Sequence, residues 1–368
     1  MTSALHPPAS GLARRRMTRL LAPVGVLALL AAVATVVLSP GDDRVPLPDT
    51  TPDALVAALR GSGATGFSGI VVSHFSLGVP IVPGDDEAST EEAGPDLSAP
   101  DDASMLALLD GAHTMQVWYG GVDQQRVAVL GATDETDLFR NGRDLWRWNS
   151  ARRVAVHLQL PVGNRPLLSS AVPRAADATS LTPSGLAGSV LAALDGKTKV
   201  EIAPGVEVAD RPAYNLVLTP QERSTRIGSV HIAVDGATKI PLAVQVYARG
   251  AEQPAVDVGF TSIRLGRPPA AYFHFAPPVG ATVRQAGATT SPPITILGSG
   301  WTSVLSAPSV GPLELNRFVT QEMSRVSGTW GTGRVLHTDL VTVLLTDDQR
   351  LFVGAVDPDE LYTAAGNR

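Results

Sequence analysis

The sequence predicts a mostly β (α+β) protein, in which a curved antiparallel sheet is partly closed over a few helices and a small α+β extension follows. Between residues 51 and 285, about eleven short apolar runs rich in β-branched residues are separated by turn residues. Only roughly two or three helical patterns interrupt these runs, so most neighbouring strands have no helix between them. Strands joined in this way pair antiparallel, and the apolar face of their sheet must be covered.

The first expected element is a helix that begins at Thr51 and Pro52, a favourable N-cap followed by proline at the first helical position. Residues 61–66 then read GSGATG, which matches the dinucleotide-binding pattern G-x-G-x-x-G. That fingerprint needs a strand before it and a helix after it, because the pyrophosphate binds at the helix N-terminus. Here the helix comes first and the β-branched run FSGIVVSHF follows. We therefore expect the glycines to end a helix, and nucleotide binding is disfavoured.

Two later runs, residues 152–160 and 228–236, alternate apolar and polar side chains with the period of two that is typical of half-buried antiparallel strands. His157 and His231 are expected on the polar faces of these strands. The apolar positions of the two runs are Val154, Val156, Leu158, Val230, Ile232 and Val234.

A second helix is expected between these strands, with Thr182 as its N-cap and Pro183 at its first position. Residues 196–198 (Gly-Lys-Thr) resemble the end of a Walker A motif. They lack its first glycine and they follow a helix instead of opening one, so we interpret them as a turn.

Residues 286–368 have the pattern of a separate, small α+β region. The run LNRFVTQEMSRV, residues 315–326, favours a helix, and residues 334–357 favour a hairpin that turns at DDQR. Asp357 is expected to open a final helix, with Glu360 placed to complete a capping box.

The N-terminus predicts a membrane anchor. Residues 1–19 form a basic tail, and residues 20–38 are 19 residues without a charge. As a helix these would extend about 28 Å, close to the thickness of the hydrocarbon core. The arginines before this segment and a tether of residues 39–50 after it place the N-terminus in the cytoplasm and the main domain outside, in a single-pass cell-membrane protein. The alternative is a secretory signal peptide that is cleaved after Ala34.

The charge of the extracytoplasmic part is negative. The 29 basic residues less the four arginines before residue 20 leave 25, against 35 acidic ones, a net charge of −10 for residues 39–368. This balance disfavours nucleic acid and anionic lipid headgroups as partners. Residues 82–104 concentrate eight carboxylates without one base. They lack the spacing of a calcium-binding loop, so we expect a solvated, disordered loop.

Motifs for catalysis are absent from the sequence. It contains no cysteine, no G-x-S-x-G and no H-E-x-x-H, and its seven histidines are scattered. We therefore expect a non-enzymatic protein without a metal or cofactor.

A curved sheet partly closed over too few helices leaves an apolar cavity, which is the usual form of a site for a small molecule or lipid. The alternative is that side chains fill the space, and the sequence leaves the two equally open. The candidate cavity residues are Val117, Trp146, Val154, Val156, Leu158, Leu216, Leu218, Val230, Ile232 and Val234.

Residues 51–285 resemble the LolA/RseB (MucB) superfamily of lipoprotein carriers and sigma-factor regulatory proteins. The resemblance is carried, in order, by TPDALVAALRGSG before FSGIVVSHF, by QQRVAVLG before LFRNGRDLWRWNSARRVAVHL, by RPAYNLVLTP before VHIAVDGATKIPLAVQVY, and by FHFAPPVGATV. Two features depart from the carriers: the acidic insertion at residues 82–104 and the membrane anchor.

The resemblance implies a half-open β-barrel with helices as a lid, and Arg126 as a counterpart of the arginine that ties the barrel to that lid in carriers. It also implies a lipid or acylated protein as ligand. Because an anchored protein cannot shuttle, we expect local sensing with an anti-sigma or other membrane protein as partner, as in RseB-like members. The alternatives are a released lipoprotein carrier and an interaction domain with a filled core.

Overall fold

The computed structural model describes residues 47–61, 66–78, 111–131, 133–160, 182–285, 295–308, 320 and 322–367. All of them belong to one compact unit, Val36–Arg368. The expected membrane anchor at residues 20–38 and the acidic segment at residues 82–104 lie outside the described residues.

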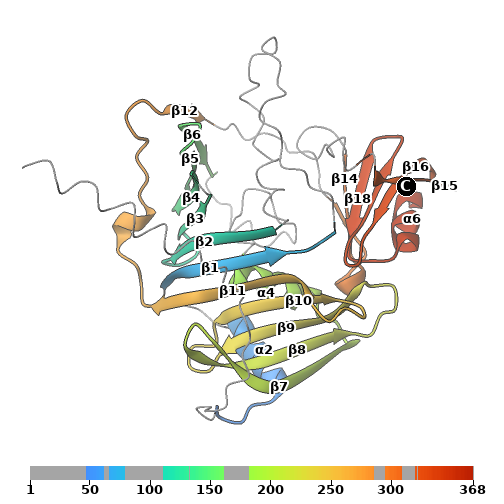
Figure 1. Cartoon of the computed structure of the whole chain (residues 1–368), viewed down its shortest axis with the longest axis horizontal. Helices are drawn as coiled ribbons and strands as arrows, with labels where there is room; N and C mark the ends of the chain where they lie inside the picture. The colour runs from blue at the N-terminus through green and yellow to red at the C-terminus, as the bar shows by residue number, and fades with distance from the viewer. Residues whose placement is uncertain are drawn as a thin grey trace, which may run out of the picture. The chain divides into compact units, whose positions relative to one another are not determined.

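The described structure is mostly β, as predicted, and its largest element is an open, curved sheet of twelve strands (Figure 1). The order across the sheet is β12-β6-β5-β4-β3-β2-β1-β11-β10-β9-β8-β7. The strands are β1 (Phe67–Phe75), β2 (Gly111–Tyr119), β3 (Gln124–Leu130), β4 (Glu135–Asn141), β5 (Asp144–Asn149), β6 (Val154–Gln159), β7 (Thr198–Val208), β8 (Arg211–Pro220), β9 (Ile227–Asp235), β10 (Pro241–Ala248), β11 (Pro254–Leu265) and β12 (Thr282–Gln285).

Eleven of these strands pair antiparallel with their neighbours, and β12 adds a twelfth that runs parallel to β6. Strand β11 lies beside β1, whereas β12 lies at the far edge of the sheet, beside β6. In Figure 1 the sheet is so twisted that β7–β10 are seen face-on and β3–β6 edge-on. This is the right-handed twist that accumulates in a large open sheet.

Two helices lie against one face of this sheet. Helix α2 (Pro52–Gly61) begins where the Thr51 hydroxyl accepts a hydrogen bond from the Ala54 amide at 3.2 Å. Helix α4 (Pro183–Ala193) begins in the same way, with Thr182 accepting from the Gly185 amide at 3.3 Å. Because α2 precedes the glycine pattern and β1 follows it, the order expected from the sequence is confirmed.

The second sheet has six strands in the order β13-β14-β18-β17-β16-β15, and helix α6 (Pro358–Gly366) packs on it. A 3-10 turn, η4 (Gly300–Thr302), connects its first two strands. The strands are β13 (Thr295–Leu297), β14 (Val304–Pro308), β15 (Ser324–Gly328), β16 (Gly331–His337), β17 (Thr342–Thr346) and β18 (Arg350–Gly354).

Two expectations for this region are wrong in part. Within the helix predicted at residues 315–326, Thr320 and Glu322 are helical as expected, whereas Ser324–Val326 belong to strand β15, because pairing with β16 overrides local helix propensity. Asp357 precedes α6 as expected, but its side chain makes no capping hydrogen bond. Its carboxylate instead contacts the Arg226 guanidinium at 3.1 Å.

The loop between β8 and β9 attaches the six-stranded sheet. The Arg226 amide donates to the Ala355 carbonyl and the Asp357 amide donates to the Ser224 carbonyl, each at 2.8 Å. The Arg226 Nε also donates to the Asp339 carbonyl at 3.0 Å. Next to Asp339, Leu340 is only 5% exposed and belongs to a core cluster of the large sheet. One arginine and one leucine thus contribute to holding the two sheets in contact.

Candidate ligand-binding face

The register of the strands shows which residues lie on each of the two faces of the twelve-stranded sheet. Residues directly opposite each other on neighbouring antiparallel strands share a face. One face carries Leu216, Ile232 and Val244, which lie in one core cluster with residues of α2 and α4. We call it the helix face. The opposite side is called the strap face, because residues 267–285 cross it between β11 and β12. All but two of the candidate cavity residues lie on the helix face.

At the β7–β10 end, the helix face is filled. Helix α4 contacts β10 and β11, and α2 contacts β7. Leu55 and Leu59 of α2, Ala187 of α4 and Trp301 pack here. Five candidate cavity residues are fully buried in this cluster: Leu216, Leu218, Val230, Ile232 and Val234. At this end of the sheet, these five candidate cavity residues therefore pack in the core.

Val117 lies near the middle of the same face and is also buried. It is 4% exposed and belongs to a cluster with Phe67, Met115 and Phe260. This cluster continues the core from β10 and β11 across β1 and β2 to β3.

At the β4–β6 end, the helix face carries apolar side chains that are half-buried. Val154, Val156 and Leu158 alternate along β6 as the sequence predicts, while Ala155, which faces the other side, is fully buried. Val156 lies opposite Arg147, and Leu158 lies opposite Leu145. The half-buried apolar set of this end is Leu138, Leu145, Val154, Val156 and Leu158. We call it the β4–β6 apolar surface.

Trp146 and Arg126 lie on the strap face instead. There a 3-10 turn, η3 (Ala270–Phe273), and the residues after it contact β3 and β4. The Phe275 ring lies 4.9 Å from Phe139 and 5.3 Å from Trp146, measured between ring centroids. Trp146 also stacks on His157 at 4.1 Å, so this histidine lies on the strand face expected from the sequence and packs there against an aromatic ring. Before β12, the Val279 carbonyl of the strap accepts a hydrogen bond from Arg153 at 2.6 Å.

Arg126 is held by carboxylates and aromatic rings of the strap face. Its Nε donates to Asp137 at 2.8 Å, and its guanidinium lies 4.5 Å from the Trp118 ring and 4.7 Å from the Phe139 ring. Beside it, burial and the neighbouring Asp137 raise the pKa of Glu135 to about 7, while the Arg126 charge lowers it. Among the described residues these contacts lie across the sheet from α2 and α4, and the lid-tying role that the resemblance implied for Arg126 stays a prediction.

The helix and strand patterns of the sequence do not predict the strap. Its one signal in the sequence is the alternation Phe273-His274-Phe275 before Pro277 and Pro278. None of the helices in the described ranges is long and apolar enough to span a bilayer. Residues 20–38 lie outside those ranges, so the anchor stays a prediction.

Comparison with known proteins finds no matching protein-family model and no matching curated protein. Solved structures do match. The Pseudomonas aeruginosa MucA/MucB complex is 16% identical, with 85% of this chain and 96% of that chain covered and a TM-score of 0.43. The LolA superfamily protein NE2245 from Nitrosomonas europaea is 15% identical over 62% of this chain and 99% of that chain, with a TM-score of 0.23. A lipoprotein-sorting protein domain from Vibrio parahaemolyticus, described as putative, is 7% identical over 58% and 93%, with a TM-score of 0.22.

These matches include MucB and LolA-superfamily proteins, the superfamily that the sequence resembles. All three TM-scores lie below 0.5 and all three identities below 25%, so the likenesses carry no conclusion about function.

Proposed function

We propose that this chain is a non-enzymatic binding protein that takes an acyl chain or a lipidated molecule against the β4–β6 apolar surface. One observation supports the proposal most. A single continuous sheet face is filled by α2 and α4 at the β7–β10 end, whereas its apolar side chains at the β4–β6 end are only half-buried. A site of this kind is mostly apolar, pre-formed and bordered by few polar groups.

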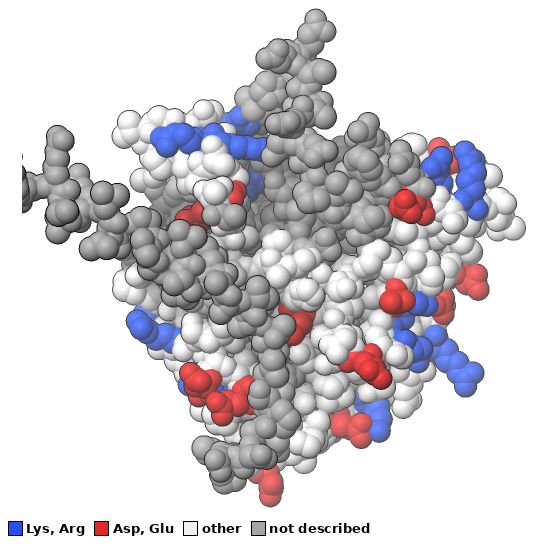
Figure 2. Space-filling model, viewed as in Figure 1, with Lys and Arg blue, Asp and Glu red and all other residues white. Residues whose placement is uncertain are grey.

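The chemistry of the surface fits an amphiphile. Each methylene group of an acyl chain that leaves water contributes about 0.8 kcal/mol, so a few half-buried leucine and valine side chains can hold one. Arg140 and Arg147 lie on the same face, beside Leu145 and Val156, where they can orient the polar end of a ligand. Figure 2 shows basic side chains gathered over the end of the sheet that carries β5, β6 and β12.

We further propose that the protein is anchored in the cell membrane by residues 20–38, with the described residues outside the cytoplasm, and that its output is regulatory. An anchored binding protein reports on its ligand locally, through a membrane protein such as the anti-sigma partner that the resemblance implies. Fractionation of cells tests the anchor: the proposal expects the chain in the membrane pellet. Recovery of a soluble form that begins after Ala34 would favour a released carrier.

Displacement of a fluorescent fatty-acid probe tests the acyl site. Val156→Glu sets a carboxylate among apolar side chains, and desolvating that charge is expected to weaken probe binding by about tenfold or more. Val283→Glu is the matched control, because Val283 pairs with Ala155 on the strap face and is 47% exposed. Equal binding by both variants, or no binding by the unsubstituted protein, would favour an interaction domain with a filled core.

A further inference from the structure

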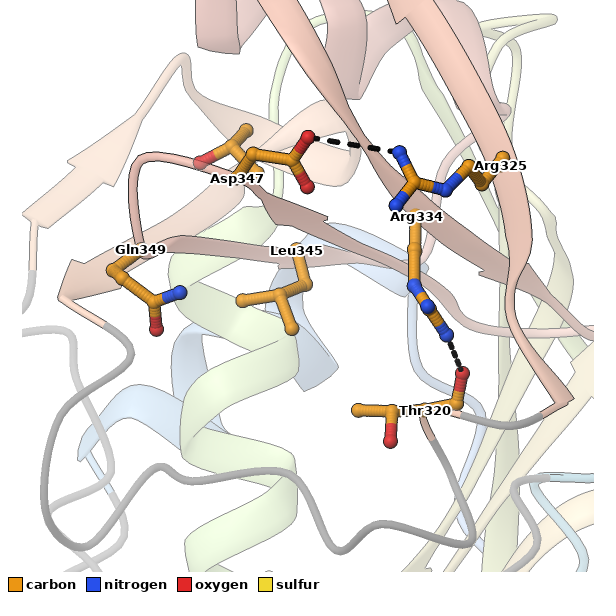
Figure 3. Close-up of a pocket in the computed structure, with 7 residues that line it drawn as sticks. Thr320, Arg325, Arg334, Leu345, Asp347 and Gln349 are labelled. Carbon is orange, nitrogen blue, oxygen red and sulfur yellow. Dashed lines mark hydrogen bonds and ion pairs between the residues drawn. The ribbon is translucent and has the colours of Figure 1, made fainter.

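The six-stranded sheet carries a pocket of about 480 Å³ on the face that lies away from α6 (Figure 3). Leu344 packs in one core cluster with Leu361 of α6, so Leu345, the next residue of β17, lies on the opposite face. Arg334 on β16 lies directly opposite Leu345, and Arg325 on β15 lies opposite Arg334. The three side chains therefore share the pocket face. The described lining is completed by Thr320, Thr346, Asp347 and Gln349.

Arg334 holds a half-buried positive charge that no carboxylate of the described residues balances. Its Nη1 donates a hydrogen bond to the Thr320 carbonyl at 2.8 Å (Figure 3), and it forms no ion pair within those residues. A carbonyl oxygen accepts a hydrogen bond but does not neutralise a charge, and a partly desolvated charge without a counterion is costly. The guanidinium has five N–H donors in a planar fork, so its other donors can hold an oxyanion.

The remaining charges in the described lining are one guanidinium and one carboxylate. Arg325 lies 3.9 Å from Asp347, at the limit of an ion pair, and its side chain is 71% exposed, so a ligand can reach it from solvent. In Figure 3 the Arg325 side chain is directed toward Asp347. The Asp347 carboxylate also accepts a hydrogen bond from the Thr332 hydroxyl. Two guanidinium groups and one carboxylate leave a net charge of +1, which suits a ligand with one anionic group.

The size and polarity of the pocket indicate a ligand larger than a bare ion. Its volume of about 480 Å³ falls in the range of sites for small organic molecules, roughly 300–1,000 Å³. Beside the guanidinium groups lie a carboxylate and an amide, Asp347 and Gln349, whose oxygens accept hydrogen bonds from hydroxyl groups. Leu345 is the only apolar residue in the described lining. A polyol that carries one phosphate group fits these features, because phosphate presents several acceptor oxygens to the planar forks of arginine.

We propose that this pocket binds a small soluble polyol phosphate, with Arg334 and Arg325 on the phosphate group and Asp347 and Gln349 on the hydroxyl groups. The site lies on the six-stranded sheet and does not depend on an acyl ligand at the β4–β6 apolar surface. A small anion responds chiefly to the charges within a Debye length of about 10 Å, whereas an extended membrane surface meets the net charge of −10 of residues 39–368. This difference favours a soluble ligand over an anionic lipid headgroup.

The test is a phosphorus NMR titration of the full chain in a phosphorus-free nonionic detergent at low ionic strength. Glycerol phosphate is the probe, and broadening of its signal measures binding, which is expected in the millimolar range. Inorganic phosphate is expected to displace the probe but to bind about threefold to tenfold more weakly, because it lacks the hydroxyl contacts. Glycerol alone is expected to leave the signal of the probe unchanged.

Substitutions with effects of opposite sign locate the site. Arg334→Ser is expected to weaken binding of glycerol phosphate about tenfold, and Arg334→Lys, which keeps the charge without the fork, is expected to recover part of that loss. Asp347→Asn removes the carboxylate charge and is expected to tighten binding of inorganic phosphate about threefold. Arg264→Ser is the matched control, because it removes an exposed arginine from β11 of the large sheet, and binding is expected to stay unchanged. Circular dichroism verifies that all four variants fold.

Two results would overturn the site: no broadening with glycerol phosphate at millimolar concentration, or equal weakening by Arg334→Ser and Arg264→Ser. Weaker binding of inorganic phosphate by Asp347→Asn would overturn the placement of the anion beside that carboxylate. Short-chain phosphatidylglycerol tests the source of the phosphate group. If it displaced the probe at a concentration about tenfold below that needed with unlabelled glycerol phosphate, the soluble ligand would be wrong and a lipid headgroup would take its place.

Discussion

Replacing Asp257 by asparagine is expected to change how the stability of this protein depends on pH. Asp257 lies on β11, opposite His74 on β1 and Gln245 on β10. Its Oδ1 is buried and makes no hydrogen bond within the described residues. Burial raises the pKa of Asp257 from its ordinary 3.8 to about 6, although the Gln245 hydrogen bond and the His74 charge lower it. The folded protein therefore prefers this carboxyl group protonated.

The sign and size of the effect follow from this preference. Well below the ordinary pKa of 3.8, the carboxyl group is protonated in both states and its ionisation does not lower stability. Between about pH 4 and pH 6 the unfolded chain releases the proton while the folded protein keeps it, so stability falls as pH rises. A rise in pKa from 3.8 to about 6 corresponds to at most about 3 kcal/mol at 1.36 kcal/mol per pH unit. Above about pH 6 the full cost remains, since the folded protein then holds an ionised carboxylate without a partner for Oδ1.

Urea unfolding, followed by tryptophan fluorescence, measures the free energy of unfolding at about pH 3 and about pH 8. Asp257→Asn is expected to match the unsubstituted protein at the lower pH and to exceed it by about 1–3 kcal/mol at the higher pH. Asp210→Asn is the matched control, because Asp210 is exposed at the turn between β7 and β8. If Asp257→Asn were less stable than the unsubstituted protein at the higher pH, the ionised carboxylate would have to be a favourable group, and the reasoning would fail.

Three further changes test the packing. Leu55→Ala removes a side chain that is 1% exposed under the sheet and is expected to cost about 2–5 kcal/mol in urea unfolding. Phe275→Ala removes the half-buried ring that contacts Phe139 and Trp146, so we expect a loss of about 2 kcal/mol and a weaker near-ultraviolet circular dichroism signal from the tryptophans. Arg226→Ala removes the contacts to Asp357 and the Asp339 carbonyl; hydrogen exchange at residues 355–357 is expected to accelerate, and an unchanged rate would contradict the account of this contact.

The elements that local chemistry defines could be predicted from the sequence. The start of α4 follows from Thr182 and Pro183, whose roles need only the next few residues. The same local rules predicted that helix α2 precedes strand β1. These local rules were wrong at Ser324–Val326, because these residues pair with β16 and form a strand although their sequence pattern is helical.

The face of each apolar side chain could also be predicted, because alternation along a strand defines it. The sequence could not show which end of the face the helices cover, since that depends on contacts between residues far apart in the chain. Leu55 packs in one cluster with Ile232, although most strands of the large sheet lie between these two residues in the sequence. The same limit applies to Phe275, because its partners Phe139 and Trp146 lie on strands that are far from it in the sequence.

The measurement that tests the acyl site most directly is native mass spectrometry of residues 40–368 after purification from membrane-containing cells, followed by solvent extraction. The account predicts a retained acyl species in the unsubstituted protein and in Val283→Glu, and its loss in Val156→Glu with the circular dichroism spectrum unchanged. A protein that carries no acyl species, or a Val156→Glu variant that keeps it, would contradict a lipid site on the β4–β6 apolar surface.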